Sequence, residues 1–338
     1  MGQPQYVVGI DIAAETFTAT VLSPPDQIVL VSEQIVNGPE GYQQFLSELK
    51  QHHVGRKRSV VVMEATGVYG EQLCYYLYAN GYQVAVEPPH AVKKAFRFKQ
   101  KNDTVDSRQI AEYGCRFFDI LRFWKPKTEI LEQIQTLLTT REQLTKQRTA
   151  SQNALQMLRR KVIQTPLAVA TYEENVERLG EQIKRIDQAI KELIDQDPTL
   201  RQKGNLANKV PGVGLLLTAN LMVITGGFCH HVNPKSLAAY LGICPYEHTS
   251  GTSVRRKDHS DRRGTGRIRK LLYLASLSVK EHNRPFRAYF YRKVAEGKSQ
   301  RLVLNNIANR LLKVICATVK SQIPYHENYR SIHPALIK

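Results

Sequence analysis

The chain has 338 residues, too many for one compact domain and enough for two or three domains with a core each. Hydrophobic residues make up 42% of it, which excludes a disordered protein. No apolar run approaches the roughly 20 residues that span a bilayer, and the start MGQPQYVVGI lacks the features of a secretory signal. We therefore expect a soluble, cytoplasmic protein that does not act at a membrane.

The net charge of +18 is distributed unevenly along the chain. Residues 1–125 contain 13 basic and 13 acidic residues, a net charge of zero, and residues 126–209 contain 14 and 11, a net charge of +3. The remaining 21 basic and 6 acidic residues give residues 210–338 a net charge of +15. Such an excess in one third of the chain favours nucleic acid as the partner of that region.

The first 125 residues show the pattern of a mixed α/β sheet. The expected strands cover residues 6–11, 16–22, 28–36, 59–63 and 83–86. The expected helices cover residues 41–51 and 71–79, and a third begins near residue 91. The order β-β-β-α-β-α-β-α predicts an RNase H-like (RuvC-like) domain over residues 1–125, with helices on the faces of a mixed sheet.

Residues 126–204 are predicted to form a helical coiled-coil segment. The second helix has a heptad seam of Leu179, Ile183, Ile186, Ile190 and Leu193. The first helix has a looser apolar series of Ile130, Ile134, Leu137, Leu144, Leu155 and Leu158. Thr171 and Glu174 predict a capping box at the start of the second helix, and Pro198 predicts its end. The two helices can pack within one chain or against a second subunit, and the sequence does not distinguish these arrangements.

Residues 205–338 are predicted to form a mainly α-helical basic domain. It opens with V-P-G-V-G at residues 210–214, which is typical of a phosphate-binding helix-hairpin-helix and equally of a tight turn without a ligand. An apolar helix over residues 237–245 and a polar loop over residues 246–254 should follow. We expect nucleic acid to be bound by the basic cluster Arg255, Arg256, Lys257, Arg262, Arg263, Arg267, Arg269 and Lys270.

Cysteines and histidines do not indicate a metal site in this chain. The five cysteines are scattered and include no C-x-x-C pair, so we expect reduced thiols. His230 and His231 beside Cys229 lack the spacing of metal ligands and are interpreted as loop residues.

Carboxylates at the ends of predicted strands indicate a metal site. Asp11 ends the first strand in V-G-I-D-I, and Glu64 ends the fourth in V-V-M-E-A-T-G. In an RNase H topology these strands are neighbours, so the two carboxylates meet at one edge of the sheet. Like charges this close need a cation, and their oxygen atoms suit Mg²⁺ or Mn²⁺.

Asp103 and Asp106 extend this candidate site. They lie at the start of a predicted helix with i, i+3 spacing, which places both on one face. The four residues can form an Asp/Glu/Asp/Asp cluster that holds metal against a phosphate. The alternatives are a turn residue at Asp11, a helix cap at Asp103, and the phosphate motif of actin-like ATPases at G-I-D-I-A, although a second glycine-rich phosphate loop is missing.

Several motifs along both halves of the chain point to one family. The N-terminal half has G-I-D at Asp11, E-A-T-G-V-Y from Glu64 and K-N-D-T-V-D-S-R ending at Arg108. The C-terminal half has V-P-G-V-G, L-A-A-Y-L-G-I-C-P and T-S-G-T-S-V-R at residues 210–214, 237–245 and 249–255. With these motifs the chain resembles the DEDD insertion-sequence transposases related to the Piv invertase, a family of bridge-RNA-guided recombinases. At Glu87 this chain differs from the resembled family, in which that position is frequently an Asn. That Asn contacts no catalytic group.

The resemblance implies a catalytic serine at Ser250, with Thr252 and Ser253 as neighbouring candidates. Gly251 would let a phosphodiester approach, and the basic cluster would stabilise the charge on its oxygens. The family also implies a DNA transposase that joins donor and target DNA, a structured guide RNA, a composite site between subunits, a dimer that assembles into a synaptic tetramer, and a prokaryotic host. The alternatives are a RuvC-like Holliday-junction nuclease that uses metal-activated water and a non-catalytic nucleic-acid-binding protein.

Overall fold

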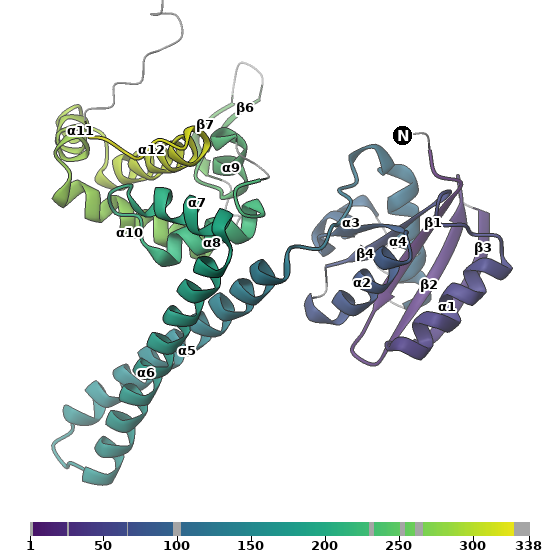
Figure 1. The fold of residues 1–338 in the computed structure, drawn as a ribbon, viewed down its shortest axis with the longest axis horizontal. Helices are drawn as coiled ribbons and strands as arrows, with labels where there is room; N and C mark the ends of the chain where they lie inside the picture. Colours follow the sequence, from purple (N-terminus) through teal and green to yellow (C-terminus); the bar gives the residue numbers. More distant parts are fainter. Residues whose placement is uncertain are drawn as a thin grey trace, which may run out of the picture. The chain divides into compact units, whose positions relative to one another are not determined.

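The computed structural model describes residues 3–25, 27–65, 67–96, 103–229, 233–250, 254–260 and 266–327, with the side chains of 103, 245–250 and 254–260 left undescribed. The chain divides into two compact units, residues 1–126 and 127–338 (Figure 1). The prediction of three parts, with boundaries near 125 and 204, stays a prediction.

The first unit contains a five-stranded mixed sheet. Its strands are β1 (Tyr6–Ile12), β2 (Thr16–Ser23), β3 (Gln27–Val36), β4 (Ser59–Glu64) and β5 (Gln83–Glu87). Their order across the sheet is β3-β2-β1-β4-β5, with the first two pairings antiparallel and the last two parallel. The strand pattern predicted from the sequence is confirmed, and β1 and β4 are neighbours as expected.

Helices cover both faces of this sheet. They are α1 (Pro39–Gln51), α2 (Glu71–Ala79), α3 (Pro89–Ala95) and α4 (Asp103–Arg116), with short 3-10 turns η1 (Gly67–Gly70) and η2 (Phe118–Ile120). Val8 and Ile10 of β1 pack with residues of α1 and α2, whereas Val7 packs with residues of α3 and α4. The alternation of a strand therefore divides β1 between two cores.

Helix α4 lies unusually close to the sheet because of two glycines. A Cβ atom at Gly9 would lie 2.2 Å from the backbone nitrogen of Ala111 and from the backbone oxygen of Ser107. A Cβ atom at Gly114 would lie 2.6 Å from Val7. The hydroxyls of Thr20 and Ser107 are hydrogen-bonded at 2.8 Å within this contact. The two glycines and this hydrogen bond thus determine how closely α4 packs on β1.

The second unit is mostly helical. Its helices are α5 (Glu129–Arg159), α6 (Pro166–Gln196), α7 (Pro198–Asn208), α8 (Leu215–Thr225), α9 (Pro234–Tyr240), α10 (Gly266–His282), α11 (Arg284–Ala295) and α12 (Gln300–Ser321). One hydrophobic core joins α7 to α12 with the N-terminal part of α5 and the C-terminal part of α6. Leu131 and Ile194 are among the side chains that enter this shared core.

Helices α5 and α6 pack against each other as a hairpin within the chain (Figure 1). Arg141 of α5 donates two hydrogen bonds to the Asp187 carboxylate of α6, at 2.5 and 3.1 Å. The predicted capping box is wrong: α6 already begins at Pro166, and the Thr171 hydroxyl donates to the Leu167 carbonyl inside the helix. Proline starts the helix earlier because its fixed φ suits the first helical position.

The expectations for residues 237–254 are wrong in detail. Helix α9 ends at Tyr240, and a two-stranded antiparallel hairpin of β6 (Pro245–Ser250) and β7 (Val254–Ser260) replaces the expected polar loop. These strands carry mostly polar and charged residues, so they lack the apolar alternation that predicts a strand.

Helix α12 was not distinguished by the sequence analysis as a long apolar segment. It is long and apolar enough to cross a membrane, with a mean hydropathy of 1.3. However, 56% of its apolar window is buried inside the structure, as in the core helix of a soluble protein. Val303, Ile307 and Leu311 belong to the core of the second unit.

Replacing Gly9 by alanine should force α4 away from β1, because the new methyl group meets backbone atoms that cannot rotate aside. We expect Gly9→Ala to lower the free energy of unfolding by roughly 3 kcal/mol. Gly55→Ala is the matched control, since a Cβ atom there meets no atom within 4 Å. Equal stability of the two variants in urea denaturation would contradict the described contact.

Candidate active site

Two carboxylates lie at the ends of neighbouring parallel strands. Asp11 is the penultimate residue of β1 and Glu64 is the last residue of β4, one step beyond the registered pair Ile10 and Met63. Both residues continue the alternating series whose earlier members, Val7 and Val62, pack under α4. Asp11 and Glu64 are therefore on the same face and at the same edge of the sheet.

Helix α4 brings a third carboxylate to this edge. Ser107 is fixed by its hydrogen bond to Thr20 and by the close approach of its carbonyl to Gly9, which places Asp106 beside the strand ends. Partial burial raises the pKa of Glu64 above 4.5, Lys93 opposes that shift, and the charge of Asp106 adds to it. Asp106 is thus close enough to Glu64 for their charges to repel.

Of the four predicted carboxylates, the structure describes the side chains of Asp11, Glu64 and Asp106. Asp103 is the first residue of α4, one helical turn before Asp106, but its side chain is outside the described part of the structure. Among the described residues, no three Asp, Glu, His or Cys side chains are grouped closely enough to enclose a metal ion. Mg²⁺ needs fewer than three protein ligands, since it usually binds one or two protein carboxylates together with water and substrate phosphates. The carboxylate oxygens of Asp11, Glu64 and Asp106 are of the donor type that such an ion prefers.

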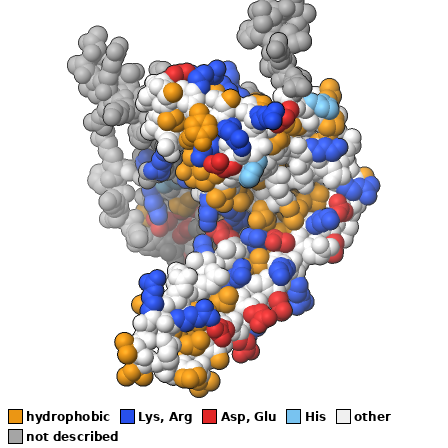
Figure 2. All heavy atoms as spheres, turned by 90° about the vertical axis from the view of Figure 1, so that its left-hand side faces the viewer, with side chains coloured by type: hydrophobic (Ala, Val, Ile, Leu, Met, Phe, Trp, Pro, Cys, Tyr) orange, Lys and Arg blue, Asp and Glu red, His pale blue; other side chains and the backbone are white. Residues whose placement is uncertain are grey.

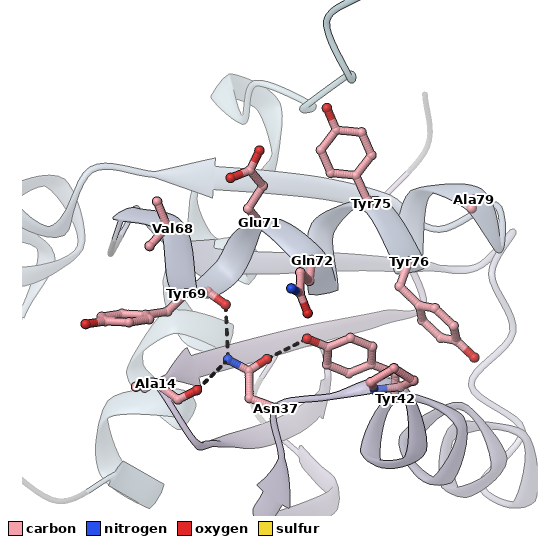
Figure 3. Close-up of a pocket in the computed structure, with 11 residues that line it drawn as sticks. Ala14, Asn37, Tyr42, Val68, Tyr69, Glu71, Gln72, Tyr75, Tyr76 and Ala79 are labelled. Atoms are coloured by element: carbon pink, nitrogen blue, oxygen red, sulfur yellow. Dashed lines mark hydrogen bonds between the residues drawn. The ribbon is translucent and has the colours of Figure 1, made fainter. Parts of the chain in front are cut away.

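Asn37 connects the segments that follow β1 and β4. Its amide nitrogen donates to the carbonyls of Ala14 and Tyr69 at 3.3 and 3.1 Å, and its amide oxygen accepts from Tyr42 at 2.6 Å (Figure 3). The same nitrogen also donates to the Ala13 carbonyl at 3.0 Å. Beside it lies an open cavity of about 970 Å³ that is rich in tyrosine. Asn37 therefore stabilises the backbone just beyond Asp11 and Glu64, a role that the sequence analysis missed.

Glu87 was also missed as a neighbour of the site. It ends β5 in register with Glu64 and is on the same face, because Ala85 two residues earlier packs under α4. The Tyr113 hydroxyl of α4 donates to its carboxylate at 3.4 Å. Burial and Glu87 raise the pKa of Tyr113, which keeps this donor protonated. A carboxylate at the end of a buried strand was the available signal, the same one that identified Glu64.

Ser250 is the last residue of β6, and its backbone is paired with that of Val254 in β7. Gly251, Thr252 and Ser253 lie outside the described residues. The start of the hairpin is held by α12, because the side-chain amides of Asn305 and Asn309 both donate to the Ile243 carbonyl, at 3.0 and 2.9 Å. The backbone of this hairpin is thereby anchored two residues before β6 begins.

The predicted basic cluster divides into groups with different environments. Arg255, Arg256 and Lys257 are in β7, where side chains are not described, and Arg262 and Arg263 lie outside the described residues. Arg267 pairs with Glu142 of α5 at 2.6 Å, and Arg269 donates to the Leu241 carbonyl at 3.2 Å. Lys270 is exposed on α10. Arg267 and Arg269 thus make protein contacts that the sequence analysis did not foresee.

Lysine and arginine are not confined to that cluster. Figure 2 shows them spread among hydrophobic and acidic side chains over the face turned to the viewer. His230 and His231, interpreted as loop residues, lie outside the described residues.

The V-P-G-V-G segment forms a turn between α7 and α8. Gly212 has a φ of +73°, and a Cβ atom there would lie 2.8 Å from the carbonyl oxygen of Ala275 in α10. Val210 and Val213 are buried in the core. These contacts explain both the glycine and the valines by packing, while phosphate binding by this turn stays a prediction.

Family models match both halves of the chain. A DEDD-type IS110 transposase model matches residues 8–162, and the model of the IS116/IS110/IS902 transposase family matches residues 204–291. The chain belongs to this transposase family. Its first unit is accordingly a DEDD transposase domain of RuvC-like fold, and the remainder is mostly helical.

Relatives in this family differ in the reaction for which they are named. The pilin gene-inverting protein of Moraxella lacunata is 27% identical over 327 residues, covering 94% of this chain and 97% of that protein. The transposase for insertion sequence element IS1111A of Coxiella burnetii is 23% identical over 348 residues, covering 94% and 91%. An uncharacterized protein of insertion element IS110 from Streptomyces coelicolor is 24% identical over 154 residues, covering 46% and 37%.

Glu64→Gln should not destabilise the protein in chelator at neutral pH, because it removes a half-buried charge that faces Asp106. The raised pKa means that the folded state binds this proton more tightly than the unfolded state. The wild type should therefore become more stable relative to Glu64→Gln as the pH falls from the raised pKa toward 4.5.

Denaturation of both proteins across this pH range measures the effect, with exposed Glu15→Gln as the matched control. A Glu64→Gln variant that is less stable than the wild type at neutral pH without metal would show that protein contacts already satisfy this carboxylate.

Proposed function

We propose that this transposase cleaves and rejoins DNA through Ser250, with Asp11, Glu64, Asp103 and Asp106 holding Mg²⁺ or Mn²⁺ at the scissile phosphate. As a member of a transposase family the protein is a DNA recombinase. The observation that carries the proposal is the placement of Asp11 and Glu64 at the edge where β1 and β4 end side by side, with Asp106 close enough for its charge to raise the pKa of Glu64. Paired carboxylates of this kind lose their mutual repulsion when a divalent cation binds.

In the proposed reaction the Ser250 oxygen attacks phosphorus and forms a serine phosphodiester. The bond from phosphorus to the sugar oxygen of the leaving strand breaks, that oxygen takes up a proton, and the serine hydroxyl loses one. The hydroxyl of the incoming strand then attacks the same phosphorus and releases Ser250. A bound divalent cation would supply Lewis-acid stabilisation of the phosphate oxygens. Each phosphodiester is exchanged for another, so no external energy source is required.

The chain's own charges support the assignment of the second unit to nucleic acid. Residues 210–338 have a net charge of +15, while residues 1–125, which include the carboxylates, have none. We infer that the basic region binds donor and target DNA and, as in the resembled family, a structured guide RNA. Arg255, Arg256, Lys257, Arg262, Arg263 and Lys270 are the members of the cluster proposed for phosphate contacts. Arg267 and Arg269 are better explained by the protein contacts described above.

Exposed apolar side chains at the tip of the α5–α6 hairpin favour the assembly of more than one copy of the chain. Near the tip of the α5–α6 hairpin, Met157, Val162, Ile163 and Leu167 are exposed by 72, 101, 83 and 78%. Exposed apolar groups gathered at one place are typical of an interaction surface. We propose that the hairpins contribute to a coiled-coil contact within a dimer that assembles into a tetramer, where carboxylates of one subunit face the serine of another. The proposed setting is the cytoplasm or nucleoid of a prokaryote.

Ser250→Ala should abolish strand cleavage and the covalent protein–DNA adduct while DNA affinity stays the same, because the change removes one oxygen atom and no charge. A denaturing gel of protein with labelled DNA and Mg²⁺ measures the adduct, and Ser253→Ala is the matched control. A RuvC-like nuclease would instead leave free DNA ends without an adduct, and a non-catalytic binding protein would leave the DNA intact. An adduct on Ser253, or recombination by Ser250→Ala, would overturn the serine assignment.

A further inference from the structure

A small basic cleft lies between α9, α11 and α12, and the residues that line it include none from the cluster of residues 255–270. It has a volume of about 330 Å³, and its lining includes Lys235, Tyr289, Asn306, Arg310 and Lys313. Three of these side chains are cationic, and no Asp or Glu is among the residues that line the cleft. In the described part of the structure none of the three cations forms an ion pair. The cleft thus concentrates positive charge that its own protein residues do not neutralise.

Aromatic packing orients one of these cations. The guanidinium carbon of Arg310 lies 3.8 Å from the centre of the Tyr289 ring, a cation–π contact. Tyr289 is buried, so it provides a fixed platform for the guanidinium plane. An arginine that stacks by its face retains N–H donors along its edge, where they match the oxygens of a phosphate.

The cleft adjoins the start of the β6–β7 hairpin. Cys244, which lines it, is the residue before Pro245, where β6 begins. Asn309, another lining residue, donates to the Ile243 carbonyl at 2.9 Å. A ligand bound here would therefore contact the residue that precedes β6, the strand that ends at Ser250.

We propose that this cleft binds a backbone phosphate of a nucleic-acid strand close to the base of the β6–β7 hairpin. Three cations around a small volume match an oxyanion, and phosphates are the anions that a nucleic acid presents at every nucleotide. Contacts of this kind position a strand without reading its sequence. The inference rests on the proposed function in one respect, that the strand belongs to the DNA substrate or to an RNA guide.

The test compares two double variants of the full-length protein. Arg310→Gln/Lys313→Gln removes two charges from the cleft, and Arg301→Gln/Lys320→Gln removes two exposed charges from the ends of the same helix. Dissociation constants for a labelled duplex DNA and for a labelled single-stranded RNA are measured over a series of salt concentrations. A melting curve for each variant establishes that it is folded.

The cleft variant should reduce the log–log salt slope by about one unit, as expected for the loss of one phosphate contact, equally for probes of two unrelated sequences. The control variant should change the slope less. An effect with DNA alone or with RNA alone identifies the strand that occupies the cleft. Equal slopes for both variants with both probes would overturn the proposal.

This outcome is independent of the serine chemistry. Binding is measured without cleavage, so a missing covalent adduct would refute the proposed nucleophile and leave the cleft result intact. Conversely, an adduct formed by a protein whose cleft variant binds normally would support the proposed function and refute this inference.

Discussion

The close contact between α4 and β1 is the constraint on which the candidate site depends. Two positions without side chains, Gly9 and Gly114, let the helix backbone approach the sheet, and the Thr20–Ser107 hydrogen bond fixes its rotation. Asp106 precedes Ser107 directly, so the same contact determines where its carboxylate lies relative to β1 and β4. The hydrophobic core and the acidic site are therefore set by one packing arrangement, since a shift of the helix would move the carboxylate as well.

The electrostatics of the site link folding to ligand binding. Burial and the charge of Asp106 both disfavour the ionised form of Glu64, so the protein maintains this arrangement at a cost in stability. A divalent cation would convert that repulsion into attraction and would stabilise the folded state by mass action. In the second unit the imbalance has the opposite sign, and nucleic acid would relieve it. In the proposed function the first unit would bind a cation and the second unit a polyanion.

The sequence predicts the parts of this architecture that depend on local patterns. The strand ends at Asp11 and Glu64, together with the RNase H-like order of elements, predict their shared edge, and the i, i+3 spacing predicts that Asp103 and Asp106 lie on one side of a helix. That Asp11 and Glu64 also share a face follows from the register of the strands. The sequence did not predict long-range contacts: Asn37 donates to Tyr69, 32 residues away in the chain, and Arg267 pairs with Glu142, 125 residues away. The β6–β7 hairpin also escaped prediction, because its polar strands do not bury an alternating apolar face.

The central claim is that a divalent cation binds where β1, β4 and α4 meet. Iron-mediated cleavage tests it most directly: Fe²⁺ replaces Mg²⁺, ascorbate and peroxide generate radicals at the bound ion, and the cut positions are mapped by mass spectrometry. The account predicts cuts close to Asp11, Glu64 and Asp106 that excess Mg²⁺ suppresses and that Asp106→Asn weakens. Cuts confined to other regions of the chain, or cuts near these residues that persist at full strength in Asp106→Asn, would contradict it.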